Sequence, residues 1–156
     1  MTINNTWAYN MHDRDFKSAQ FLIRGLVEVA SRGGNFLLNV GPQPDGTIQP
    51  EFKDRLGEIG EWLSLNGESI YETTYGPIQG VASLRTTMKG KSVFVHIFDW
   101  PAGTLELTGL GAKAISARML ANGEPVTFEQ TERSLQIKLP KQPPGSVVDV
   151  VALKTL

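Results

Sequence analysis

A group of aromatic and amide side chains near the N-terminus is the first feature that could bind a small molecule. The run Trp7-Ala8-Tyr9-Asn10 closely follows Asn4 and Asn5. A tryptophan ring can stack on the apolar face of a sugar, and asparagine amides can bond to hydroxyl groups. The alternative is a Trp7 that packs beneath a loop, and the spacing is compatible with both.

A glycine-rich segment, Gly33–Pro42, is the second candidate. It contains neither G-x-G-x-x-G nor a terminal Gly-Lys-Ser/Thr, so nothing in it indicates phosphate binding. We interpret Gly33 and Gly34 as the end of a helix that leads into a buried strand. Asn39 ends that strand. Its amide could serve a functional site there or tie the next loop to the backbone.

Carboxylates are the third candidates, since glycoside hydrolysis usually needs two that face each other. The first half of the chain offers Asp13, Asp15, Glu28, Asp45, Glu51, Asp54, Glu58 and Glu61. Glu28 falls off an apolar helical stripe, and the last three lie on the polar side of a helix. Asp13 and Asp15 flank a helix start, where capping explains them, and Asp45 lies in a turn. The pattern indicates no catalytic pair.

The remaining reactive residue types are sparse. The chain has two histidines, and we expect His12 in a loop and His96 either in the core or facing outward from a strand. Neither has partners at metal-ligand spacing, so we predict no metal and no cofactor. The absence of cysteine excludes disulfides and thiolate chemistry. No nucleophile elbow is present.

Composition narrows the class of partner. The 156 residues are 40% hydrophobic and 20% charged, with a net charge of -1. This balance predicts a soluble globular protein and favours neither nucleic acid nor a membrane. Residues 1–6 lack the basic and apolar regions of a signal peptide, so the chain as given reads as cytoplasmic, with its true compartment unknown.

The elements that must position these residues differ between the two halves. Before Pro77, apolar spacing predicts a helix over 16–31 with Ser18 or Asp15 as N-cap, a strand over 35–40, and a second helix beginning at Pro50. A further strand at the N-terminus would complete the order strand, helix, strand, helix. That order is typical of a parallel α/β sheet or barrel.

From about residue 78 the pattern is all-β. Seven short strands are predicted over 81–87, 92–98, 104–107, 114–119, 126–129, 134–138 and 147–153. The strand over 92–98 is mostly apolar, so we expect it to be central. Short strands at this spacing suggest an antiparallel sandwich packed against the first half.

Several stretches, taken together and in order, resemble the α-L-fucosidases of glycoside hydrolase family 29. They are residues 1–10, Leu22–Val27, Ser31–Pro42, Asp45–Ile48, Gly60–Leu63 and Asn66–Tyr71. One departure is Ala8, where the family often has glycine. The resemblance covers residues 1–77, and the β-rich half falls where the family carries its C-terminal sandwich.

The resemblance implies a fold and an activity. Residues 1–77 would be the last βαβα portion of the catalytic (β/α) barrel, and residues 78–156 the C-terminal antiparallel β-sandwich domain. The activity would be retaining hydrolysis of terminal α-L-fucosides in a fucosylated glycan, through an aspartate nucleophile and commonly a glutamate acid/base. Both belong to earlier parts of the barrel, so we assign no catalytic residue here. The family's sugar-stacking aromatic falls on Trp7.

Met1 would then be an internal methionine of a longer sequence, and the chain a truncated gene, the second half of a split gene, or a fragment. Three functions follow as expectations. The chain could be part of a fucosidase that is inactive alone, or a non-catalytic carbohydrate-binding or barrel-complementing module acting with a partner chain. The third is catalysis in a homo-oligomer, through Asp13, Asp15 and Asp45 of neighbouring copies.

Overall fold

The computed structural model describes residues 1–156 and places two helices in the first half of the chain. Helix α1 spans Ala19–Ala30. The Ser18 hydroxyl caps it by accepting a hydrogen bond from the Phe21 amide, so the cap is Ser18 and not Asp15. The chain leaves the helix through Gly33, whose φ of 70° lies in the left-handed region that glycine adopts without strain. The predicted end at the two glycines is therefore confirmed.

Helix α2 spans Pro50–Asn66 and continues into a short 3₁₀ helix, η1, over Gly67–Ser69. Pro50 occupies the first turn as predicted, where a missing N–H costs nothing. The apolar spacing of this segment predicts a buried face formed by Leu56, Ile59, Trp62 and Leu63. Ile59 and Trp62 are buried, together with Phe52, whereas Leu56 is exposed. None of the helices is long and apolar enough to cross a membrane.

The strand predicted over 35–40 is not formed. Only an isolated parallel bridge joins Asn39 to Thr2. It is held by a bond from the Met1 amino group to the Leu37 carbonyl (2.8 Å) and one from the Asn39 amide to the Met1 carbonyl (2.9 Å). Leu37 is 71% exposed, so the segment is not buried on both faces as expected. A single parallel bridge without further flanking strands does not extend into a ladder.

The second half forms two antiparallel sheets. The five-stranded sheet has the order β1-β2-β3-β8-β5, and the three-stranded sheet the order β4-β7-β6. Their bounds are β1 Thr74–Tyr75, β2 Leu84–Lys89, β3 Ser92–Ile97, β4 Thr104–Thr108, β5 Ala114–Met119, β6 Thr127–Gln130, β7 Ser134–Lys138 and β8 Asp149–Thr155. All seven predicted strands are present within a few residues, and β1 is additional. Strand β3 pairs with both β2 and β8, which confirms its central position.

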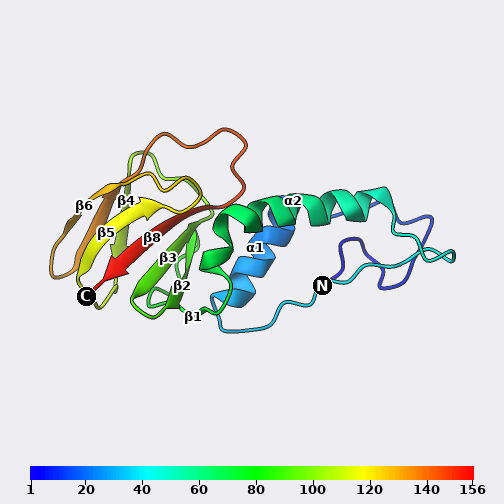
Figure 1. The fold of residues 1–156 in the computed structure, drawn as a ribbon, viewed down its shortest axis with the longest axis horizontal. Coiled ribbons are helices and arrows are strands. Elements are labelled where there is room, and N and C mark those ends of the chain that lie inside the picture. Colours follow the sequence, from blue (N-terminus) through cyan, green and yellow to red (C-terminus); the bar gives the residue numbers. More distant parts are fainter.

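Side-chain alternation along β3 explains why the five-stranded sheet has a different neighbour on each face. Val93, Val95 and Ile97 belong to a core shared with the three-stranded sheet. Phe94 points the other way, into a core built with the helices, α1 and α2, which lie beside this sheet in Figure 1. The helices, the large sheet and the small sheet therefore form successive layers, and the halves are packed together as predicted.

Candidate functional site

Trp7 lies in the irregular segment that precedes α1, and its side chain is 59% exposed. No aromatic partner stacks against its ring. The sequence left open whether Trp7 packs beneath a loop, and the structure presents it at the surface instead. An exposed indole on a polar loop provides a flat apolar platform with a hydrogen-bond donor at its edge.

The Trp7 backbone is anchored from the glycine-rich segment. The side-chain amide of Asn39 donates to the Trp7 carbonyl at 2.7 Å. At Gly41, an added Cβ atom would lie 2.7 Å from the Tyr9 nitrogen and 2.8 Å from the Ala8 carbonyl carbon. The sequence left two roles open for Asn39, one in a functional site and one in tying the next loop to the backbone. The structure shows a bond to the backbone, but the loop that it holds is that of Trp7, 32 residues earlier in the chain.

The amides expected near the aromatic group are engaged within the loop. Asn4 is 1% exposed and donates to the Thr6 hydroxyl at 3.3 Å. The Asn10 side chain accepts from the His12 amide at 3.0 Å. Asn4 is therefore not positioned to contact a ligand, because its side chain is buried.

The acidic residues of this region hold the same loop. One carboxylate oxygen of Asp13 accepts from the Asn5 amide at 2.8 Å. Asp15 accepts from the Asn5 side chain at 3.1 Å. Capping of α1, the role expected for them, falls to Ser18 instead, because Asp13 and Asp15 bond back to the N-terminal loop. Their bonds give both carboxylates a structural role.

Asp45 lies in the predicted turn. It accepts from the Thr47 amide at 3.0 Å and from the Thr47 hydroxyl at 2.7 Å. These bonds favour the ionised form and hold the pKa of Asp45 below its usual value. A general acid needs the opposite shift, so Asp45 does not fit that role. The helix carboxylates Asp54, Glu58 and Glu61 are exposed, as predicted.

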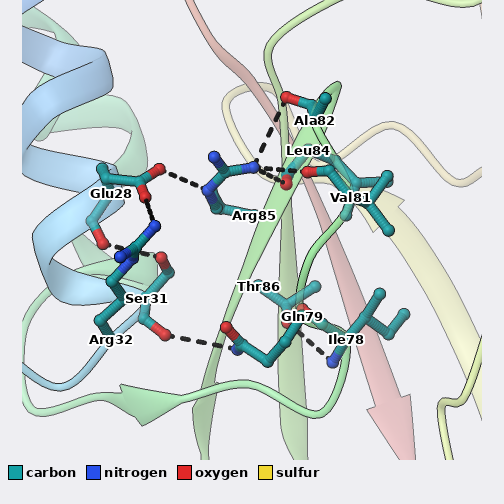
Figure 2. Close-up of polar contacts among 10 residues, drawn as sticks. All are labelled: Glu28, Ser31, Arg32, Ile78, Gln79, Val81, Ala82, Leu84, Arg85 and Thr86. Carbon is teal, nitrogen blue, oxygen red and sulfur yellow. Dashed lines mark hydrogen bonds and ion pairs between the residues drawn. The ribbon is translucent and has the colours of Figure 1, made fainter.

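A charged cluster that the sequence did not indicate joins α1 to β2. Glu28 pairs with Arg32 one turn later and with Arg85 of β2, as Figure 2 shows. Arg85 also donates to the Leu84 carbonyl at 2.7 Å, and its guanidinium carbon lies 5.3 Å from the centroid of the Phe98 ring. Glu28 and Arg85 are 57 residues apart, so no local spacing could reveal their pairing.

His96 lies in the core and not on an outward face. It is fully buried, and burial lowers its pKa to about 3. Its Nε2 lies 3.1 Å from the Thr87 hydroxyl, which donates its proton to the Ser69 carbonyl at 2.6 Å. Nε2 must therefore carry the ring proton, which leaves Nδ1 as a buried acceptor without a partner. No group of three or more His, Asp and Glu residues is arranged to hold a metal ion.

Two clefts lie away from Trp7. The larger, of about 690 Å³, lies between the β4–β5 connection and the β6–β7 turn and is lined by residues such as Lys113, Gln130 and Arg133. The smaller, of about 440 Å³, lies beside the charged cluster and is lined by Arg32, Arg85 and the loop 79–82. Neither contains an exposed aromatic residue that could stack on a sugar.

Comparison with known proteins identifies the relatives of this chain. A family model described as α-L-fucosidase matches residues 1–68. Human tissue α-L-fucosidase is 35% identical over 150 residues, and human plasma α-L-fucosidase is 33% identical over 155. The chain belongs to the α-L-fucosidase family. The match covers 91% of this chain but only 32% of the tissue enzyme, a C-terminal part, so the chain spans about a third of the length of its curated relatives.

Solved fucosidase structures extend this match to the whole fold. Isoenzyme 1 from Paenibacillus thiaminolyticus is similar to this family member with a TM-score of 0.92 and 36% identity, covering 100% of this chain and 39% of the bacterial one. A Thermotoga maritima α-fucosidase in complex with fucose matches with a TM-score of 0.85 and 32% identity over 98% of this chain. The fucosidase similarity therefore includes both the helices and the two sheets.

Proposed function

We propose that this chain acts as the C-terminal part of a retaining α-L-fucosidase, which hydrolyses terminal α-linked L-fucose when the rest of the catalytic barrel is present. The observation that carries the proposal is the similarity to a fucosidase structure over the entire chain, at a TM-score of 0.92, although the chain spans 39% of that structure. The substrate would be a fucosylated glycan or a simple fucoside.

Within this proposal, residues 1–77 are the last portion of the (β/α) barrel and residues 78–156 are the β-sandwich domain. The parallel bridge between Thr2 and Asn39 supports the first assignment, because α1 lies between the two bridged segments as it would in a βαβ unit. The core shared by two antiparallel sheets supports the second.

Trp7 would form one wall of the sugar site. Its exposed ring and its anchored backbone support this role. The chain's own carboxylates do not offer the nucleophile or the acid, since Asp13, Asp15 and Asp45 are all bonded within their own loops. Loss of a covalent nucleophile removes the chemical route, so the chain alone should not turn over substrate.

The test is complementation. This chain would be co-expressed with the part of the Paenibacillus enzyme that precedes the matched region, and hydrolysis of 4-nitrophenyl α-L-fucoside would be measured. We expect neither piece to be active alone and the pair to be active. Trp7→Ala should then lower kcat/KM about tenfold, the size of a lost aromatic contact. Tyr75→Ala is the matched control, because Tyr75 in β1 is a similarly exposed aromatic residue.

Turnover by the chain alone that disappears in Asp13→Asn, Asp15→Asn or Asp45→Asn would overturn this proposal. It would support catalysis by carboxylates that converge in an oligomer. Light scattering on the active fraction would then show more than one copy.

A second candidate is a non-catalytic module that binds carbohydrate or completes a barrel with a partner chain. The exposed apolar side chains of the first half favour it, since large apolar surfaces are usually covered. They include Met11, Phe21, Leu37 and Leu56, which are 42–71% exposed. Size-exclusion chromatography with light scattering tests it. A monomer that binds neither fucoside nor the complementing piece would contradict this candidate.

A further inference from the structure

The loop that carries Trp7 is fixed by residues that act on its backbone and not on its ring. The side-chain amide of Asn39 donates to the Trp7 carbonyl. The next carbonyl, that of Ala8, accepts from the Thr6 hydroxyl at 2.9 Å. We propose that Asn39 and Gly41 are positioning residues that set the direction of the Trp7 ring. The functional meaning of this role rests on the proposed sugar site, but the anchoring itself can be tested without any sugar.

The exposure of Trp7 is what makes backbone anchoring decisive. A buried ring is held by its neighbours in the core, whereas Trp7 is 59% exposed and has few neighbours to hold its ring. The bond to the Trp7 carbonyl holds the backbone from which the side chain projects, and the ring then takes one of the staggered rotamers that this backbone allows. A platform held before the ligand arrives avoids the ordering cost that a mobile side chain adds to binding.

Gly41 contributes by having no side chain. An added Cβ would lie 2.7 Å from the Tyr9 nitrogen, 2.8 Å from the Ala8 carbonyl carbon and 3.2 Å from the Ala8 oxygen. These are backbone atoms, which cannot move aside without moving the loop. Gly41 is not among the glycines with positive φ, so its requirement is for space and not for an unusual conformation.

The identity of Asn39 is equally specific. Its Nδ2 supplies the proton that the Trp7 carbonyl accepts. An aspartate has nearly the same shape but only acceptor oxygens when ionised, so it would place a negative charge against that carbonyl. The parallel bridge to Thr2 is made by the backbone of residue 39 and does not depend on the side chain.

The experiment uses 5-fluorotryptophan in the full chain and ¹⁹F NMR. The three tryptophans, Trp7, Trp62 and Trp100, give three resonances, and Trp7→Phe assigns the first. In Asn39→Asp we expect the Trp7 resonance to shift. We also expect the fraction of molecules in which the Trp7 loop has left its anchored position to rise about fivefold, which is the effect of losing one ordinary hydrogen bond. The other two resonances should stay in place. Asn35→Asp, an exposed asparagine of the same segment, is the control.

Gly41→Ala provides an independent variant if Asn39→Asp folds poorly. It should move the Trp7 resonance without moving those of Trp62 and Trp100. Gly57→Ala is its control, because an added Cβ there meets nothing within 4 Å. Such a result would support the positioning role.

Two results would overturn the inference. One is a Trp7 resonance in both variants that matches the unchanged chain. The other is a shift shared equally by all three tryptophans, which would assign Asn39 and Gly41 a general structural role. Neither result touches the proposed fucosidase activity, whose own failure would appear only in the complementation assay.

Discussion

The burial of His96 makes the stability of this protein depend on pH in a range where few other groups titrate. Replacing His96 with leucine removes that titration while the Thr87 hydroxyl keeps its bond to the Ser69 carbonyl. The ring lies in strand β3 beside Trp62, with centroids 6.5 Å apart, and is fully buried. Any charge on it would be taken out of water, which is why its pKa falls to about 3.

The magnitude follows from proton linkage. Unfolding returns His96 to an ordinary pKa of about 6.5, so below that pH the unfolded state binds a proton that the folded state does not. Stability from this group is fully present above pH 6.5 and is lost as the pH falls toward the folded value of about 3. Between about pH 7.5 and about pH 5 the loss should be about 2 kcal/mol.

Urea unfolding of the full chain, followed by far-UV circular dichroism across this range, measures the effect. Asp45 and Glu72 have lowered pKa values and remain ionised at pH 5, so they contribute little. Burial raises the pKa of Asp149, which works in the opposite direction. Since these carboxylates are common to both proteins, the difference between the unchanged chain and His96→Leu isolates His96.

The control is His12→Gln, because His12 lies in an exposed loop. We expect it to keep the pH dependence of the unchanged chain, whereas His96→Leu should flatten it by about 2 kcal/mol over the range. Equal slopes for the unchanged chain and His96→Leu would refute the reasoning. They would mean that His96 can be protonated in the folded state at no cost.

Three further substitutions test other contacts, each by urea unfolding. Gly57→Ala should raise the free energy of unfolding by about 0.5–1 kcal/mol, because Gly57 is solvent-exposed and lies in the middle of α2, where alanine favours the helix more than glycine. A lower free energy of unfolding would mean that the site is crowded. Glu28→Gln should lower it by about 1–2 kcal/mol, since the half-buried Arg85 loses its carboxylate, and high salt should shrink the difference. Trp62→Phe should cost about 1–3 kcal/mol by leaving the Val148 carbonyl without its 2.8 Å donor, and no change would indicate that water replaces it.

Much of the fold could be predicted because its signals are local. The cap at Ser18 and the proline at the start of α2 are read from single residues. Strands β5 and β7 have the predicted bounds, since turn residues separate them from their neighbours. The strand prediction for segment 35–40 is wrong because an apolar run shows β-propensity, while pairing depends on a partner strand that the run itself does not specify.

The sequence predicted only part of the candidate site. Trp7 could be named from its residue type, but its anchoring could not, because the Asn39 amide reaches it from 32 residues away. The ion pair of Glu28 with Arg85 was missed for the same reason, because 57 residues separate the two. The pair of Glu28 with Arg32, by contrast, has the local i,i+4 spacing of a helix. The sequence could not place His96 on a particular face of its strand. Its burial results from packing between β3 and the helices.

The layered arrangement has a consequence for recombination among fucosidases. The sequence pattern changes from helical to all-β at the proposed boundary after residue 77. Two contacts cross this boundary: the ion pair of Glu28 with Arg85, and the hydrogen bond from Trp62 to the Val148 carbonyl. The helices also cover the Phe94 face of the large sheet. A chimera of two fucosidases joined at residue 77 would therefore have mismatched halves unless the residues on both sides of these contacts came from the same parent. The two parts should evolve as one unit, with compensating changes across their shared surface.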